Sequence, residues 1–166
     1  MAVNAFLTFF DQASGESIQR GHQHWVELTG WDWEVEAVTI HDIAGGGGVA
    51  KPTAGTLSCS HVFDRSSIVA LGFIASGSTF AKAQLDAVRT TGRGMPETFL
   101  SVVLERVRLT KVSLAGTEDG TVSQRLELSF ETVAIDYRAQ DQKTGALTPP
   151  ETFSWDIPAG TASPSA

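Results

Sequence analysis

Hydrophobic and polar residues alternate with a period of two along most of this chain. The clearest case is residues 122–137, where Leu126, Leu128 and Phe130 alternate with charged or small polar residues. A period of two places successive side chains on opposite faces of a β-strand. Turn residues, mainly glycine, separate such segments throughout the chain. The pattern is typical of an all-β barrel or sandwich.

The alternating segments predict strands at residues 5–10, 25–28, 31–38, 55–63, 80–88, 99–114, 122–137 and 153–157. The two longest flank the sequence Thr117-Glu118-Asp119-Gly120, and an Asp-Gly pair in such a position favours a hairpin. Only residues 66–75 have helical spacing. We expect Ser66 or Ser67 to cap that helix and Gly77 to end it, with Ile68, Leu71 and Ala75 on one stripe.

The apolar face changes within both long strands. In the first strand the change falls between Leu104 and Val107, and in the second between Phe130 and Val133. A sixteen-residue strand extends about 50 Å, which is long for one flat edge of a small domain. The change indicates either a bulge or a strand that passes from the core to an interface between subunits. We favour the interface.

Two segments lack the alternation. Residues 41–53 contain Gly45, Gly46, Gly47 and Gly48, whose backbone entropy opposes a regular element, so we expect an extended loop. Residues 159–166, after Pro158, are predicted to form a disordered tail. One β-barrel domain is therefore expected over residues 1–158.

Composition narrows the class of partner. The chain has 166 residues and a formal net charge of -7, which argues against nucleic acid or anionic lipid as the main partner. No apolar run approaches about 18 residues, so we expect no membrane insertion. The N-terminus has no basic leader, so we expect a cytoplasmic protein whose export, if any, needs no signal peptide.

Two histidines raise the possibility of a metal site. His22 and His24 would lie on one side of a strand, with Glu16 and His41 as candidates for a third ligand. Zinc-type spacings are absent. The structural alternative is favoured: His24 makes a hydrogen bond near the barrel mouth, and His22 lies in a solvated turn. We therefore expect no metal and no cofactor.

Other candidates for chemistry also have structural interpretations. Cys59 is the single cysteine, so no intramolecular disulfide forms, and it is expected to pack in a strand although His61 is a possible base nearby. Trp31 and Trp33 could stack on a sugar, but their spacing favours packing in the core or an interface. A carboxylate pair for sugar hydrolysis could come from Glu16, Glu27, Asp32, Glu34 or Glu36, although the last three form one solvated strand face. No catalytic residue is expected.

The order of the motifs resembles a known family. The sequence GES is followed by His24-Trp25-Val26-Glu27, a glycine-rich segment, SHVFD, a helix, and the strands FLSVVLERVRLTKVSLAG and QRLELSFETVAIDYRAQD. This order is similar to that of the Hcp family, the hemolysin-coregulated proteins that form the inner tube of type VI secretion systems. The similarity covers residues 5–158.

The resemblance implies a compact β-barrel with one flanking helix and an extended glycine-rich loop, a fold related to phage tail tubes. It implies homohexameric rings that stack into a tube, and partners among the sheath, baseplate, spike and effector proteins. It also implies secretion by the type VI apparatus. The family's ring-stacking loop corresponds to residues 42–54, and its contacts are expected at Ala44, Gly45, Gly46, Gly47, Gly48 and Val49.

Two alternative functions remain open. One is the tail-tube protein of a phage or of another contractile injection machine. The other belongs to a different class: a β-barrel enzyme or carbohydrate-binding domain that uses the Trp31/Trp33 and His22/His24 region.

Overall fold

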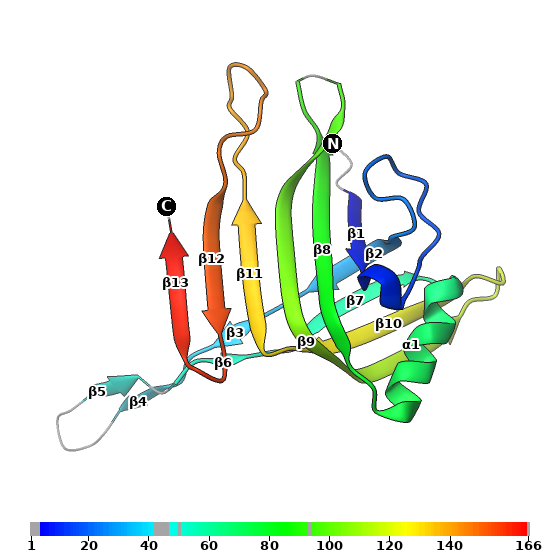
Figure 1. Ribbon diagram of the computed structural model, residues 1–166, viewed down its shortest axis with the longest axis horizontal. Coiled ribbons are helices and arrows are strands. Elements are labelled where there is room, and N and C mark those ends of the chain that lie inside the picture. The colour runs from blue at the N-terminus through cyan, green and yellow to red at the C-terminus, as the bar shows by residue number, and fades with distance from the viewer. Residues whose placement is uncertain (1–3, 42–46, 50, 93, 166) are drawn as a thin grey trace.

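The structure of the chain, a computed structural model, describes residues 4–41, 47–49, 51–92 and 94–165. Its centre is a closed antiparallel β-barrel with the strand order β10-β7-β2-β1-β8-β9, and β9 also pairs with β10 to complete the circle (Figure 1). The predicted β-barrel with one helix is confirmed. The barrel strands are β1 (Asn4–Thr8), β2 (Val26–Asp32), β7 (Leu57–Val62), β8 (Phe80–Thr90), β9 (Pro96–Gly116) and β10 (Val122–Ser129).

The sheet continues beyond the barrel at the first half of β9. There β11 (Thr132–Tyr137) pairs with β9, β12 (Glu151–Asp156) pairs with β11, and β13 (Thr161–Ser165) pairs with β12. The predicted disordered tail at 159–166 therefore differs from the structure. Its small polar residues bury little surface, but backbone hydrogen bonds to β12 hold the strand and do not depend on side-chain type.

The change of apolar face in the long strands is a bend within one subunit. Arg106 has a positive φ of 53°, and Leu104 and Val107 on either side of it are both buried. The pairing of β9 with β8 keeps one register across Arg106, from Phe80↔Val107 to Lys82↔Glu105, so the strand bends there without an inserted residue. In the partner strand the change falls between Ser129, where β10 ends, and Thr132, where β11 begins. The interface that we favoured from the sequence is not needed to explain the pattern.

One helix, α1 (Arg65–Ser76), packs against the barrel. Asp64, and not Ser66 or Ser67, is the N-cap: its carboxylate accepts from the Ser66 backbone N–H, and the Ser67 hydroxyl accepts from the Asp64 backbone N–H. Gly77 ends the helix in the left-handed region, as predicted. The predicted apolar stripe is wrong at Ile68, which is 61% exposed. The small residues Ser66, Ser67 and Ala70 are buried instead.

Aromatic rings join the helix to the barrel. The Phe80 ring lies between those of Phe9 and Phe73, with centroid separations of 4.1 and 4.0 Å. Phe9 precedes a short 3-10 helix, η1 (Phe10–Gln12). Each fully buried side chain of this size stabilises the fold by about 1.5–3 kcal/mol. The barrel core also includes Leu7, Val26, Leu57, Leu85, Leu104, Val107, Leu126 and Leu128.

A ribbon of short strands projects from the barrel. Its stem pairs β3 (Val35–Glu36) with β6 (Thr53–Ala54), and further out β4 (Thr39–His41) pairs with β5 (Gly47–Val49). Figure 1 shows β4 and β5 well beyond the barrel, on the side away from α1. Regular structure was not expected in the glycine-rich segment. Two of the glycines nevertheless belong to β5, because a strand ladder requires backbone groups alone.

Candidate functional site

The loop that contains His22 and His24 covers the outer face of β1 and β8. We call residues 10–25 the strap. His22 of the strap stacks on Phe6, with ring centroids 4.8 Å apart, and its Nε2 lies 2.9 Å from Asp86 Oδ2. Phe6 and Asp86 are cross-strand neighbours in β1 and β8. Both partners of the His22–Asp86 pair are buried, with side chains 9% exposed.

The Asp86 carboxylate is fully used within the fold. Its Oδ1 accepts hydrogen bonds from the Ser101 hydroxyl at 2.7 Å and the Gln84 amide at 2.9 Å. Its Oδ2 faces His22 and is 3.5 Å from the Thr98 hydroxyl. A carboxylate with this many donors anchors the strap and has no free position for a metal or a substrate.

The expected roles of the two histidines are reversed. His24 is exposed and has a positive φ of 65°. Its backbone N–H donates to the Ser17 carbonyl, and its carbonyl accepts from the Gly15 N–H, both at 2.8 Å. His22 makes the buried structural hydrogen bond that we expected of His24. The prediction that His22 and His24 lie on one side of a strand is wrong, because residues 13–25 form a loop and β2 begins at Val26.

The other proposed metal ligands lie apart from this pair. Glu16 lies 3.5 Å from the Arg65 Nε, and the structure does not describe the side chain of His41. Among the residues that the structure describes, no group of three or more His, Cys, Asp or Glu side chains could hold a metal ion.

Cys59 and His61 face the barrel interior from β7. His61 is fully buried: its Nδ1 is 2.8 Å from the Val62 carbonyl, and its Nε2 is 3.1 Å from Gln124 Oε1. Burial, with a smaller contribution from the nearby Asp32 carboxylate, raises the pKa of the Cys59 thiol to about 12. A thiol with this pKa stays protonated near neutral pH, so Cys59 is not a nucleophile.

Two exposed aspartates have lowered pKa values for a structural reason. A hydrogen bond from the Thr117 hydroxyl lowers the pKa of Asp119, and the Thr144 backbone N–H lowers that of Asp141. Each carboxylate closes a turn, and neither turn brings a second titratable group into a pocket.

The tryptophan segment has an exposed face at the base of the ribbon. Trp33 is anchored, since its Nε1 donates to the Gly55 carbonyl at 3.0 Å and its ring contacts Phe130. Trp31, Val35 and Val38 are 36%, 46% and 64% exposed. The predicted outer face of Asp32, Glu34 and Glu36 is exposed as expected. Of the predicted packed face, Trp33 is half-buried against the core, whereas Trp31 and Val35 are exposed.

Three of the six predicted ring-stacking residues lie in the outer strand pair of the ribbon. Gly47, Gly48 and Val49 form β5, whereas Ala44, Gly45 and Gly46 lie outside the residues that the structure describes. Neither pair of ribbon strands is hydrogen-bonded to the nine-stranded sheet. The ribbon therefore combines exposed apolar side chains with a backbone that the barrel does not hold.

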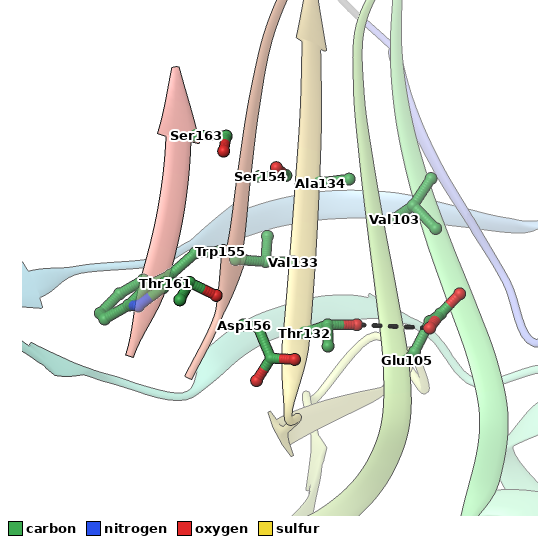
Figure 2. Close-up of a pocket in the computed structure, with 10 residues that line it drawn as sticks. All are labelled: Val103, Glu105, Thr132, Val133, Ala134, Ser154, Trp155, Asp156, Thr161 and Ser163. Atoms are coloured by element: carbon green, nitrogen blue, oxygen red, sulfur yellow. Dashed lines mark hydrogen bonds between the residues drawn. The ribbon is translucent and has the colours of Figure 1, made fainter. Parts of the chain in front are cut away.

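A shallow groove lies on the outer face of β9, β11, β12 and β13, with a volume of about 320 Å³. In Figure 2 the side chains of Val133 and Trp155 point to the opposite side of the sheet from the other labelled residues of the groove. Apart from Val103, that outer side carries alanine and polar or acidic residues, namely Glu105, Thr132, Ala134, Ser154, Asp156, Thr161 and Ser163. Sequence analysis did not identify this groove, because its residues come from four strands that are separate in the sequence.

Residues 6–138 match the model of a protein family described as "Type VI secretion system effector, Hcp". A comparison with curated proteins finds no match. Among the described residues, no helix has the length and apolar character that crossing a bilayer requires.

Solved structures of the same fold cover nearly the whole chain. The crystal structure of Hcp1 from Salmonella typhimurium is 27% identical, covers 98% of this chain and 99% of its own, and has a TM-score of 0.77. A structure described as a type six secretion system protein is 18% identical, covers 98% of this chain and 100% of its own, and has a TM-score of 0.86. The tube-terminating cap of the anti-feeding prophage is 15% identical, covers 80% of this chain and 87% of its own, and has a TM-score of 0.51. The last two show the fold alone.

Proposed function

The chain belongs to the Hcp family of type VI secretion system proteins, and on that premise we propose that it is a structural subunit of the inner tube. Copies of the chain form hexameric rings, and the rings stack head to tail inside a contractile sheath. Contraction of the sheath expels the tube together with its effectors. This work is done by assembly and requires no catalytic residue.

The ribbon is the observation that carries this proposal. It exposes Val35 and Val38, Trp31 is exposed near the end of the adjoining strand β2, and the ribbon projects beyond the barrel (Figure 1). Exposed apolar side chains that lie together on a projecting element are typical of a surface that another molecule covers. A projection of this kind matches a heterologous contact, in which one end of a subunit binds a different surface of the next copy. We assign the stacking contact to Ala44, Gly45, Gly46, Gly47, Gly48 and Val49.

The remaining partners follow from the same role. The tube subunit contacts the sheath around it, the baseplate from which it grows, the spike at its tip and the effectors that it carries. The protein is made in the cytoplasm and leaves with the tube. The chain's net charge of -7 accords with a subunit that binds neither nucleic acid nor anionic membrane.

A second machine uses a similar fold. The tube cap of the anti-feeding prophage shares it at 15% identity, so a tube protein of a phage or another contractile injection machine is the alternative. Genes beside the coding sequence distinguish the two, since secretion loci encode a membrane complex and ATPase that phage loci lack. The alternative of a carbohydrate-binding or enzyme domain lacks a comparable observation.

Assembly of the purified protein tests the proposal. Size-exclusion chromatography and negative-stain imaging are expected to show six-membered rings that stack at high concentration. A strictly monomeric protein under those conditions contradicts the proposal.

Ribbon variants test the assignment of the stacking contact. Deletion of Gly45–Gly48 and the substitution Val38→Ser are both expected to leave rings intact and to reduce stacking. Ile18→Ser is the matched control, because Ile18 is 94% exposed but lies on the strap. Normal tubes from the deletion variant would show that the ribbon does not form the contact.

A further inference from the structure

The groove on the outer sheet face has an ordered arrangement of side chains that the stacking contact does not use. One row across the strands contains Glu105, Thr132, Asp156 and Thr161, which are successive cross-strand partners. The next row contains Val103, Ala134, Ser154 and Ser163. Figure 2 shows Glu105 and Asp156 on either side of Thr132.

Both carboxylates in the first row lack an ion-pair partner among the described residues. Glu105 Oε2 is 3.5 Å from the Thr132 hydroxyl, and Asp156 Oδ1 accepts from the Ala159 backbone N–H at 3.0 Å. These neutral donors leave the negative charges uncompensated. Each carboxylate retains an oxygen that can accept a further hydrogen bond.

Among the described residues, none of the nearby cations forms an ion pair with either carboxylate. Arg106, next to Glu105 in β9, binds Glu131 with a separation of 2.8 Å. Lys82 is the cross-strand neighbour of Glu105 in β8, but its Nζ lies 5.6 Å from the centre of the Phe10 ring. Lys51 lies beside Gly160 in the turn between β12 and β13. The groove therefore presents two negative charges that this subunit does not neutralise.

The second row of side chains forms the flat floor of the shallow groove. Ala134, Ser154 and Ser163 are exposed, and their short side chains project little above the sheet. A sheet face of this kind lets a polypeptide backbone approach closely, while the serine hydroxyls can donate or accept hydrogen bonds.

We propose that the groove binds a basic polypeptide segment of a partner protein, with one Lys or Arg at Glu105 and a second at Asp156. The two carboxylates lie two strand spacings apart, which is about 10 Å. A second copy of this chain is a poorer occupant, because each copy carries a net charge of -7. The inference rests on the proposed function in one respect: a tube subunit has partner proteins that must touch its wall.

Binding of a defined basic probe tests the site. The probe is a fluorescein-labelled dodecapeptide of alternating Lys and Ser, and its fluorescence anisotropy is measured at about 0.15 M salt. Glu105→Gln combined with Asp156→Asn is expected to weaken binding by about three- to tenfold, as the loss of two partly exposed ion pairs predicts.

The matched control combines Glu27→Gln with Glu118→Gln. Both residues are exposed and lie outside the groove. This variant loses the same two negative charges, so its affinity for the probe is expected to stay within about twofold of wild type. An equal loss of affinity in both variants would show only general charge attraction and overturn the proposal. No binding of the probe to wild type would also overturn it.

A steric variant and an assembly measurement separate the remaining outcomes. Ser154→Phe fills the groove and is expected to reduce probe binding without removing a charge. Ring formation is measured on the same preparations. If the Glu105/Asp156 variant changes ring formation and leaves probe affinity unchanged, the groove is a contact between copies and the proposal is wrong. If rings never form but the probe binds in the groove, the proposed function fails and this inference stands.

Discussion

Loss of the Asp86 carboxylate should destabilise the barrel strongly, because this group joins the strap to two barrel strands. Substitution by alanine removes the acceptor of four hydrogen bonds, from His22 at 2.9 Å, Ser101 at 2.7 Å, Gln84 at 2.9 Å and, more weakly, Thr98 at 3.5 Å. His22 is buried, so its Nε2–H would be left without a partner. Ser101 and Gln84 are half-buried and can bind water instead.

The magnitude follows from these differences in burial. A hydrogen bond to a charged acceptor contributes about 1.5–3 kcal/mol, and the buried His22 donor is left without a partner when the carboxylate is removed. Each half-buried donor adds less than the roughly 1–3 kcal/mol that a fully buried unsatisfied group costs, since water replaces the lost acceptor. We expect Asp86→Ala to lower the free energy of unfolding by about 3–5 kcal/mol in total, which corresponds to roughly 10 °C in Tm for a domain of this size.

Urea unfolding followed by tryptophan fluorescence measures this loss. The Trp25 ring lies edge-on to His22, with centroids 4.7 Å apart, so the signal also reports the strap. Asp86→Asn keeps one acceptor oxygen and is expected to lose less stability than Asp86→Ala. Asp136→Ala is the control, because Asp136 is exposed on the neighbouring β11 and its loss should cost no more than about 0.5 kcal/mol.

The comparison with Asp136→Ala decides the outcome. If Asp86→Ala is within about 1 kcal/mol of this control, the buried pair does not anchor the strap. The packing of His22 on Phe6 would then be sufficient.

Three further predictions concern local structure. Gly15→Ala would place a Cβ atom 2.4 Å from the Trp25 carbonyl oxygen, a backbone atom that cannot move aside. We expect the free energy of unfolding to fall by about 2–3 kcal/mol, measured by thermal unfolding, and an unchanged Tm would contradict this. Asp64→Ala removes the cap of α1 and should cost about 1 kcal/mol in urea unfolding, whereas Asp64→Asn should retain most of the stability. Cys59, whose pKa is raised to about 12, should not react with a thiol reagent at pH 8 until the protein is unfolded; rapid labelling of the native protein would show that the thiol is accessible.

Local patterns in the sequence predicted most of the elements correctly. Alternation identified the strands that became β8, β9 and β10, and the turn at Thr117–Gly120 joins β9 and β10 as expected. Gly77 ends the helix because the left-handed conformation there favours glycine. These features depend on neighbours in the sequence, which is why the sequence revealed them.

Features that depend on distant partners were missed or misassigned. His22 and Asp86 are 64 positions apart, so no spacing rule could pair them. The small residues of β13 gave no strand signal, since that strand is held by backbone bonds to β12. The groove around Glu105 and Asp156 exists only after β9, β11, β12 and β13 align. Sequence reasoning therefore identified the barrel but not the surfaces that it builds.

The strap and the ribbon separate folding from assembly. The strap is joined to the barrel by the buried His22–Asp86 hydrogen bond and by Gly15 in contact with the Trp25 backbone, so changes there act on the stability of the monomer. The ribbon strands pair only with each other among the described residues, so the barrel does not depend on them. Val38→Ser should consequently leave the free energy of unfolding unchanged and reduce stacking. Asp86→Ala should lower the free energy of unfolding, and the molecules that remain folded should still stack. A ribbon variant that unfolded the barrel would show that the ribbon belongs to the core structure and is not an element kept for contact with another copy.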